Sequence, residues 1–177
     1  VKPLIPEFEW KGKPYRPRAN GRLGGAPANA IEEEIYDARY PLAIRYGQDN
    51  DLNKITVNPR DAWFGIMASG RVYHEIIEAA QVLGLSMRDP ANLGVRVLQM
   101  SMPFPFDRAI ARQFAQGLQE IFVVEEKRPF MEGQLRDALY GMADPPLITG
   151  KRDPEGETLV STTDAKGIIT HCNAAFV

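Results

Sequence analysis

Two hydrophobic periods alternate between residues 54 and 151, and this alternation restricts the fold more than any other feature of the sequence. Short apolar runs, which predict strands, lie at 62–68, 94–100, 120–125 and 145–150. Between them, apolar residues recur at helical spacing. Strands that alternate with helices form crossover units, and these units give a mostly parallel sheet with helices on both faces. We therefore predict a three-layer α/β domain with a sheet of about four to five strands.

The intervening helices are predicted from their apolar stripes. They begin near Val72, Phe106 and Met131, and Gly84 is the predicted stop of the first. The run at 120–125 is the most β-branched of the strands, so it is expected to be central and buried on both faces.

Composition divides the remainder of the chain. Residues 1–26 are rich in Pro, Gly and Arg and predict an extended linker or arm. Residues 27–156 form the predicted α/β domain, which starts with a helix that Pro41 should kink or end. Residues 157–177 form a tail in which 158–163 and 167–171 could pair as a hairpin. The first residue is Val and not Met, which suggests an internal fragment.

Charge and cysteine content exclude several classes of protein. A net charge of −2, with acidic and basic residues well mixed, argues against binding to nucleic acid. The apolar runs are too short to cross a membrane. Cys172 is the only cysteine, and His74 and His171 are the only histidines, so we predict no metal site and no iron–sulfur site within the chain. The lone cysteine also favours a cytoplasmic protein.

The turn Ser69-Gly70-Arg71 is a candidate anion site, because it links a predicted strand to the start of a helix. The signal is weak, since one glycine does not make a phosphate-binding loop. The alternative is a tight turn in which Ser69 caps the helix.

The segment Glu125, Glu126, Lys127 and Arg128 follows the third predicted strand. Functional groups gather at the carboxyl ends of strands in open parallel sheets, so these residues are candidates for an interface with another domain. Neighbouring carboxylates point to alternate sides and need not form an acid/base pair, and a salt bridge to Arg136 is an alternative for them. No catalytic residue is predicted.

Three stretches carry a resemblance to a known family: FGIMASGRVY at 64–73, VVEEKRPFMEGQLRDALY at 123–140 and GKRD at 150–153. They resemble the indolepyruvate ferredoxin oxidoreductases, in the region similar to the transketolase C-terminal-like domain of 2-oxoacid oxidoreductases. The resemblance implies a part of an enzyme that oxidatively decarboxylates aryl-pyruvates to acyl-CoA and passes electrons to ferredoxin. It also implies thiamine diphosphate and iron–sulfur clusters held by other parts of that enzyme, whose domains or subunits would be partners of this chain.

Two alternatives remain open. Residues 159–177, LVSTTDAKGIITHCNAAFV, resemble the opening strands of a PAS sensor domain, which would make the protein a signalling fusion. The other alternative is a small stand-alone protein that binds an anion at Ser69, Gly70 and Arg71.

Overall fold

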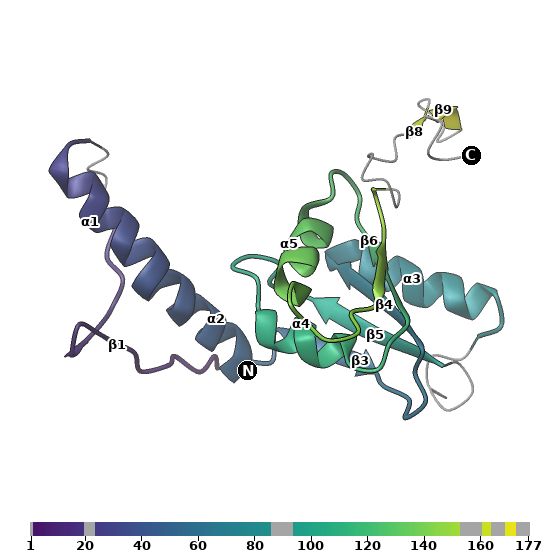
Figure 1. The fold of residues 1–177 in the computed structure, drawn as a ribbon, viewed down its shortest axis with the longest axis horizontal. Coiled ribbons are helices and arrows are strands. Elements are labelled where there is room, and N and C mark those ends of the chain that lie inside the picture. Colours follow the sequence, from purple (N-terminus) through teal and green to yellow (C-terminus); the bar gives the residue numbers. More distant parts are fainter. Residues whose placement is uncertain (1, 20–23, 86–93, 153–160, 164–168, 173–177) are drawn as a thin grey trace. The chain divides into compact units, whose positions relative to one another are not determined.

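A computed structural model of the chain describes residues 2–19, 24–85, 94–152, 161–163 and 169–172 (Figure 1). The chain divides into two compact units. The first comprises Val1–Leu52 and Phe104–Phe106, and the second comprises Asn53–Pro103 and Asp107–Val177. The first unit therefore joins the arm to the helix that follows it, whereas the sequence grouped that helix with the α/β domain.

The second unit is built on one five-stranded sheet, which confirms the predicted α/β class. Its strands are β3 (Asn53–Val57), β4 (Phe64–Ser69), β5 (Val95–Met100), β6 (Glu120–Val124) and β7 (Leu147–Thr149). Their order is β3-β5-β4-β6-β7, and only β3 runs antiparallel to its neighbour.

The sequence missed β3, which precedes the first apolar run. Its alternating burial is typical of an edge strand that is covered on one side, with Lys54 and Thr56 exposed and Val57 buried. A period of two over five residues was the available signal.

Helices cover both faces of the sheet, which gives the three layers that the sequence predicts. Helix α3 (Gly70–Val82) packs over β4 and β5 on one face. Helices α4 (Arg108–Ala115) and α5 (Phe130–Leu139) pack against each other on the opposite face (Figure 1). Asp107 begins α4 by accepting hydrogen bonds from the backbone N–H groups of Ala109 and Ile110.

Strand β4 is the central strand, and it approaches α4 closely because Gly65 has no side chain. A Cβ at Gly65 would lie 2.6 Å from Leu118 Cδ1 and 2.8 Å from Phe114 Cζ. The neighbouring strand β6 was expected to be central and buried on both faces, and this was wrong. Ile121 and Val123 are buried beneath the helices, but Phe122 on the other face is 40% exposed.

A buried ion pair holds the edge strand β7 against α5. Glu132 is fully buried, and its carboxylate Oε1 accepts hydrogen bonds from Arg136 Nε and Nη2 at 3.2 and 2.9 Å. Its other oxygen accepts from the backbone N–H groups of Lys151 and Arg152 at 2.9 and 3.2 Å. Arg136 also donates to the carbonyl oxygen of Ile148, so one pair of side chains fixes both β7 and the segment after it.

The first unit is a helix with an arm packed along it. Helix α1 (Ala26–Glu34) continues through a π-helical turn η1 (Ile35–Arg39) into α2 (Tyr40–Asp49). Pro41 does not end the helix, because it lies at the start of α2, directly after the π-helical turn that ends at Arg39 and has already shifted the hydrogen-bond register.

The arm forms a two-residue ladder between β1 (Glu9–Trp10) and β2 (Lys13–Pro14). From this arm, Tyr15 donates a 2.6 Å hydrogen bond to Glu34, which also accepts from Arg39. The Tyr15 hydrogen bond lowers the pKa of the Glu34 carboxyl, and Arg39 adds to the effect. Burial and the contact with Glu34 raise the pKa of the Tyr15 phenol.

The predicted tail hairpin is present as β8 (Ser161–Thr163) paired antiparallel with β9 (Ile169–Cys172). The turn predicted between them, the domain boundary at 156 and the last five residues of the PAS-like stretch lie outside the described residues.

Candidate functional site

The candidate site lies where the connections from two neighbouring strands diverge. Strand β4 leads into α3 on one face of the sheet, and β6 leads into α5 on the other face. In open α/β sheets, such divergence opens a crevice beyond the carboxyl ends of the strands, and ligands bind there.

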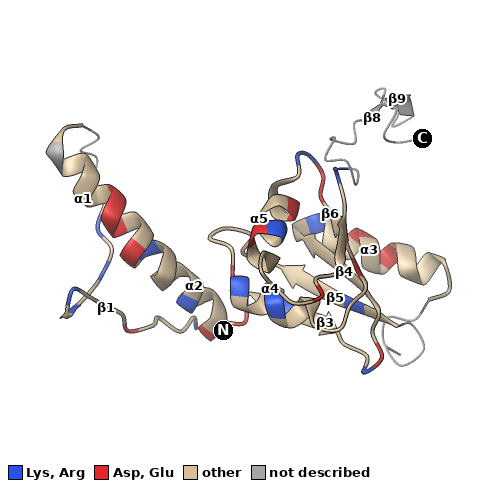
Figure 2. Cartoon of the chain, in the orientation of Figure 1, with Lys and Arg blue, Asp and Glu red and all other residues tan. Residues whose placement is uncertain are grey.

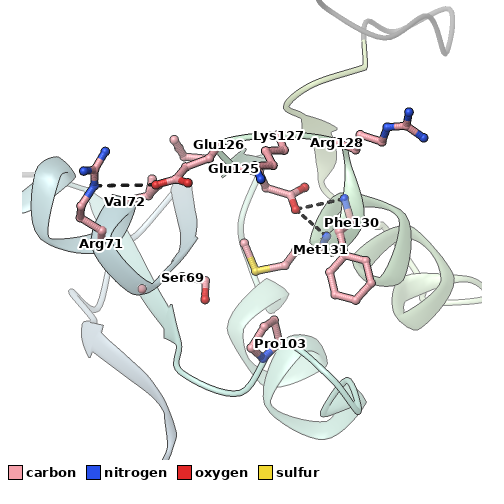
Figure 3. A pocket seen from close by; sticks show the side chains of 12 residues that line it. Ser69, Arg71, Val72, Pro103, Glu125, Glu126, Lys127, Arg128, Phe130 and Met131 are labelled. Atoms are coloured by element: carbon pink, nitrogen blue, oxygen red, sulfur yellow. Dashed lines mark hydrogen bonds and ion pairs between the residues drawn. The ribbon is translucent and has the colours of Figure 1, made fainter.

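A pocket with a volume of about 340 Å³ occupies this position (Figure 3). It is lined by Ser69, Gly70, Arg71, Val72, Pro103, Val124, Glu125, Glu126, Lys127, Arg128, Phe130 and Met131. The structure therefore brings together the two segments that the sequence singled out separately, 69–71 and 125–128. The sequence did not indicate the apolar part of the wall, which comes from Pro103 and from the start of α5.

Ser69 and Gly70 form the turn into α3. Ser69 occupies the N-cap position of α3, as the alternative interpretation expected, but its side chain makes no capping hydrogen bond. Gly70 has a φ of +55°, which favours glycine at this turn. Arg71 forms ion pairs with Glu75 at 3.0 Å and with Glu126 at 3.8 Å, and all three side chains are largely exposed.

Glu125 serves α5 and does not project freely from the sheet. Its carboxylate accepts hydrogen bonds from the first three backbone N–H groups of the helix, those of Phe130, Met131 and Glu132, at 3.0, 2.7 and 3.1 Å. Helix N-termini attract negative charge, so Glu125 takes the place that a capping side chain or a bound anion would otherwise fill. The helix needs this carboxylate because Pro129, at its N-cap, offers no side-chain acceptor.

The alternative salt bridge from Glu125 or Glu126 to Arg136 was wrong, because Arg136 pairs with Glu132. Glu132 is one turn from its partner on α5, and this spacing was the signal that could have indicated it.

Basic side chains remain at the rim of the pocket. Acidic and basic residues lie side by side in the loop between β6 and α5 (Figure 2). Within the described ranges, Lys127 and Arg128 form no ion pair. Arg128 points away from the centre of the pocket (Figure 3). Lys127 is therefore the basic group of this loop that stays at the pocket without a carboxylate partner.

The pocket does not fit thiamine diphosphate. A divalent cation that accompanies a bound diphosphate takes several oxygen ligands. Of the two carboxylates of the pocket, Glu125 is engaged by the N-terminus of α5, and Glu126 is an exposed side chain 3.8 Å from Arg71. Among the residues that the structure describes, no three His, Cys, Asp or Glu side chains gather as metal ligands, and His74 is exposed on α3. In the same part of the chain, no helix is long and apolar enough to cross a membrane.

Fold and pocket define a three-layer α/β domain with a crevice at the carboxyl edge of its sheet. The family follows from the sequence comparison. The chain belongs to the indolepyruvate oxidoreductase domain family, which matches residues 54–171. The match includes residues 159–171 of the PAS-like stretch, which favours the oxidoreductase over the signalling alternative.

Curated relatives agree with this assignment. The chain is 30% identical over 129 residues to indolepyruvate oxidoreductase subunit IorA of Methanothermobacter thermautotrophicus, covering 72% of the chain and 19% of that subunit. It is 36% identical over 78 residues to IorA of Pyrococcus abyssi, covering 44% of the chain and 11% of that subunit. The chain thus spans about a fifth or less of the relatives' length.

Among solved structures, a split-gene transketolase aligns with a TM-score of 0.43 and 19% identity, over 56% of this chain and 31% of the other.

Proposed function

We propose that this chain works as a non-catalytic domain of a cytoplasmic, indolepyruvate-type 2-oxoacid:ferredoxin oxidoreductase. The observation that carries the proposal is the family match over residues 54–171, together with the identity to IorA subunits. In the whole enzyme, an aryl-pyruvate would be oxidatively decarboxylated to an acyl-CoA, and ferredoxin would take the electrons. Thiamine diphosphate and iron–sulfur clusters would be held by other domains or subunits.

The arrangement of charged groups supports a scaffold function. Buried or engaged carboxylates serve the fold itself: Glu132 holds β7, and Glu125 completes the N-terminus of α5. A general acid or base needs a carboxylate that can reach a substrate, and neither of these two is available for that work.

The test compares the complete subunit with a variant from which residues 53–152 are deleted. The complete subunit, assembled with its partners, should reduce ferredoxin in the presence of indolepyruvate, coenzyme A and thiamine diphosphate. The deleted form should fail to assemble, and the 177-residue chain alone should show no activity. An active complex formed by the deleted subunit, or turnover by the chain alone, would contradict the scaffold function.

Binding of a small anion in the pocket is a second candidate function. It is favoured by the position of the pocket between the diverging connections and by Lys127 at its rim. Calorimetric titration with inorganic phosphate, coenzyme A and nucleotides tests it, with Lys127→Gln as the variant that should weaken binding. A matched control is Lys54→Gln on β3, outside the pocket. If no probe produces a binding heat, the pocket does not bind these anions and the second candidate function is contradicted.

A further inference from the structure

Within the described part of the second unit, helices cover only half of one face of the sheet. The strand register shows which side chains share this face: Phe122 pairs with Ile66 of β4 and with Thr149 of β7, and Leu147 pairs with Glu120. Residues on the opposite face alternate with these and lie beneath α4 and α5. On the first face, α3 packs mainly over β4 and β5, at the other end of the sheet from β7.

Burial of β6 and β7 follows this asymmetry. Ile121 and Ile148, which face the two helices, are 0% and 8% exposed. Phe122 and Leu147, which face the other way, are 40% and 54% exposed. The difference therefore arises from the missing cover and not from the position of these residues along their strands.

An exposed phenylalanine on an inner parallel strand needs an explanation. Parallel sheets occur almost only where both faces are covered, and exposed apolar patches mark interaction sites. Here a parallel pair of strands, β6 and β7, presents Phe122 and Leu147 as diagonal neighbours on one face, since Phe122 pairs with Thr149 and Leu147 pairs with Glu120. We call the surface formed by Glu120, Phe122, Val124, Leu147 and Thr149 the open face.

The chemistry of the open face favours a permanent partner. Its one charged residue is Glu120, and that carboxylate accepts a 2.8 Å hydrogen bond from the Thr149 hydroxyl. Transient encounters are steered by complementary charge, whereas permanent interfaces have apolar cores depleted of charge. The open face resembles a permanent interface, because it is mostly apolar and carries one charged residue.

We propose that the open face is the surface on which another domain of the same oxidoreductase subunit packs. This inference rests on the proposed function, because it takes the occupant from the subunit of which this chain is a domain. The IorA relatives supply the reason for the choice, since this chain covers about a fifth or less of their length. A permanent apolar partner in the same polypeptide needs no encounter step and no charge to guide it.

Thiol labelling, read at each introduced cysteine by mass spectrometry of its peptide, tests the proposal. In a Cys172→Ser background, Phe122→Cys and Leu147→Cys are introduced in turn into the 177-residue chain and into the complete subunit. Tyr140→Cys, at the end of α5, is the matched reference, because Tyr140 is 87% exposed and lies outside the open face. Rates of reaction with a maleimide are expressed relative to this reference.

Relative to Tyr140→Cys, both open-face thiols should react at least about tenfold more slowly in the complete subunit than in the chain alone. Equal relative rates in the two proteins would overturn the proposal. Sedimentation of the chain alone, with and without Phe122→Thr, tests the competing occupant. If the chain alone is a dimer and Phe122→Thr makes it dissociate, the open face binds a second copy of the chain, and the proposal is overturned.

The labelling result and the enzymatic result are independent. If the thiols are protected in a subunit that has no 2-oxoacid oxidation activity, the inference about the open face stands and the proposed function is contradicted. If the subunit is fully active and its thiols are unprotected, the proposed function stands and the inference about the open face is contradicted.

Discussion

Replacing Glu132 by Gln tests the part that this buried carboxylate plays in the fold. The substitution keeps the shape of the side chain but gives it one oxygen and one NH2 group. The new NH2 group must then point at donors that previously bound an oxygen. These are either the Arg136 guanidinium or the N–H groups of Lys151 and Arg152. The charge that pairs with Arg136 is lost in both cases.

The expected cost follows from these contacts. Breaking a buried ion pair by changing one partner costs about 3–5 kcal/mol, because the other charge remains unpaired. The Arg136 side chain is 38% exposed, so water can solvate part of its charge, and the lower end of the range applies. We therefore expect a loss of about 3 kcal/mol, which corresponds to a fall in melting temperature of about 6–12 °C for a chain of this length.

The effect is measured by urea unfolding. The fluorescence of Trp63 is recorded in a Trp10→Phe background, so that the signal reports the α/β unit alone. Glu126→Gln is the control, because that side chain is 54% exposed and lies 3.8 Å from its partner. It should change stability by less than about 0.5 kcal/mol. A loss below about 1 kcal/mol for Glu132→Gln would refute the reasoning.

Two further predictions concern the packing of a glycine and the pH response of the arm. Gly94→Ala should destabilise the α/β unit by about 2–4 kcal/mol, since a Cβ would lie 2.7 Å from the Trp63 ring at a φ of +59°. Thermal unfolding should show a smaller loss for Gly117→Ala, which has a φ of +73° but open space around it. Because the folded-state pKa of Glu34 is lowered, its contribution to stability is present at neutral pH and disappears as the pH falls through that lowered pKa. Tyr15→Phe should weaken this dependence, as measured by acid titration of the tryptophan fluorescence of the arm, and an unchanged titration would contradict the assignment.

Periodicity predicted the α/β class and four of the five sheet strands, because each apolar run is long enough to stand out from the helical stripes. It failed for β3, whose five residues carry Lys54 and Thr56 on the exposed side. It also misjudged β6, since a run of β-branched residues shows apolar character on both faces but does not show whether a helix covers each of them.

The candidate site could be predicted only in outline. Strand ends indicated 69–71 and 125–128, and the strand order brought the two segments into one pocket. The partner of Glu125 could not be read from its neighbours, because its carboxylate reaches N–H groups five to seven residues along the chain. Such a contact depends on how the loop folds back, which local patterns do not encode.

The hydrogen bonds from the first turn of α5 to the Glu125 carboxylate affect how the domain responds to anions in solution. Because the helix carries its own counter-ion, it has no need to recruit sulfate or phosphate from the medium at that end. The stability of α5 should therefore be nearly indifferent to the choice of buffer anion, and the order of this helix is a property of the chain itself.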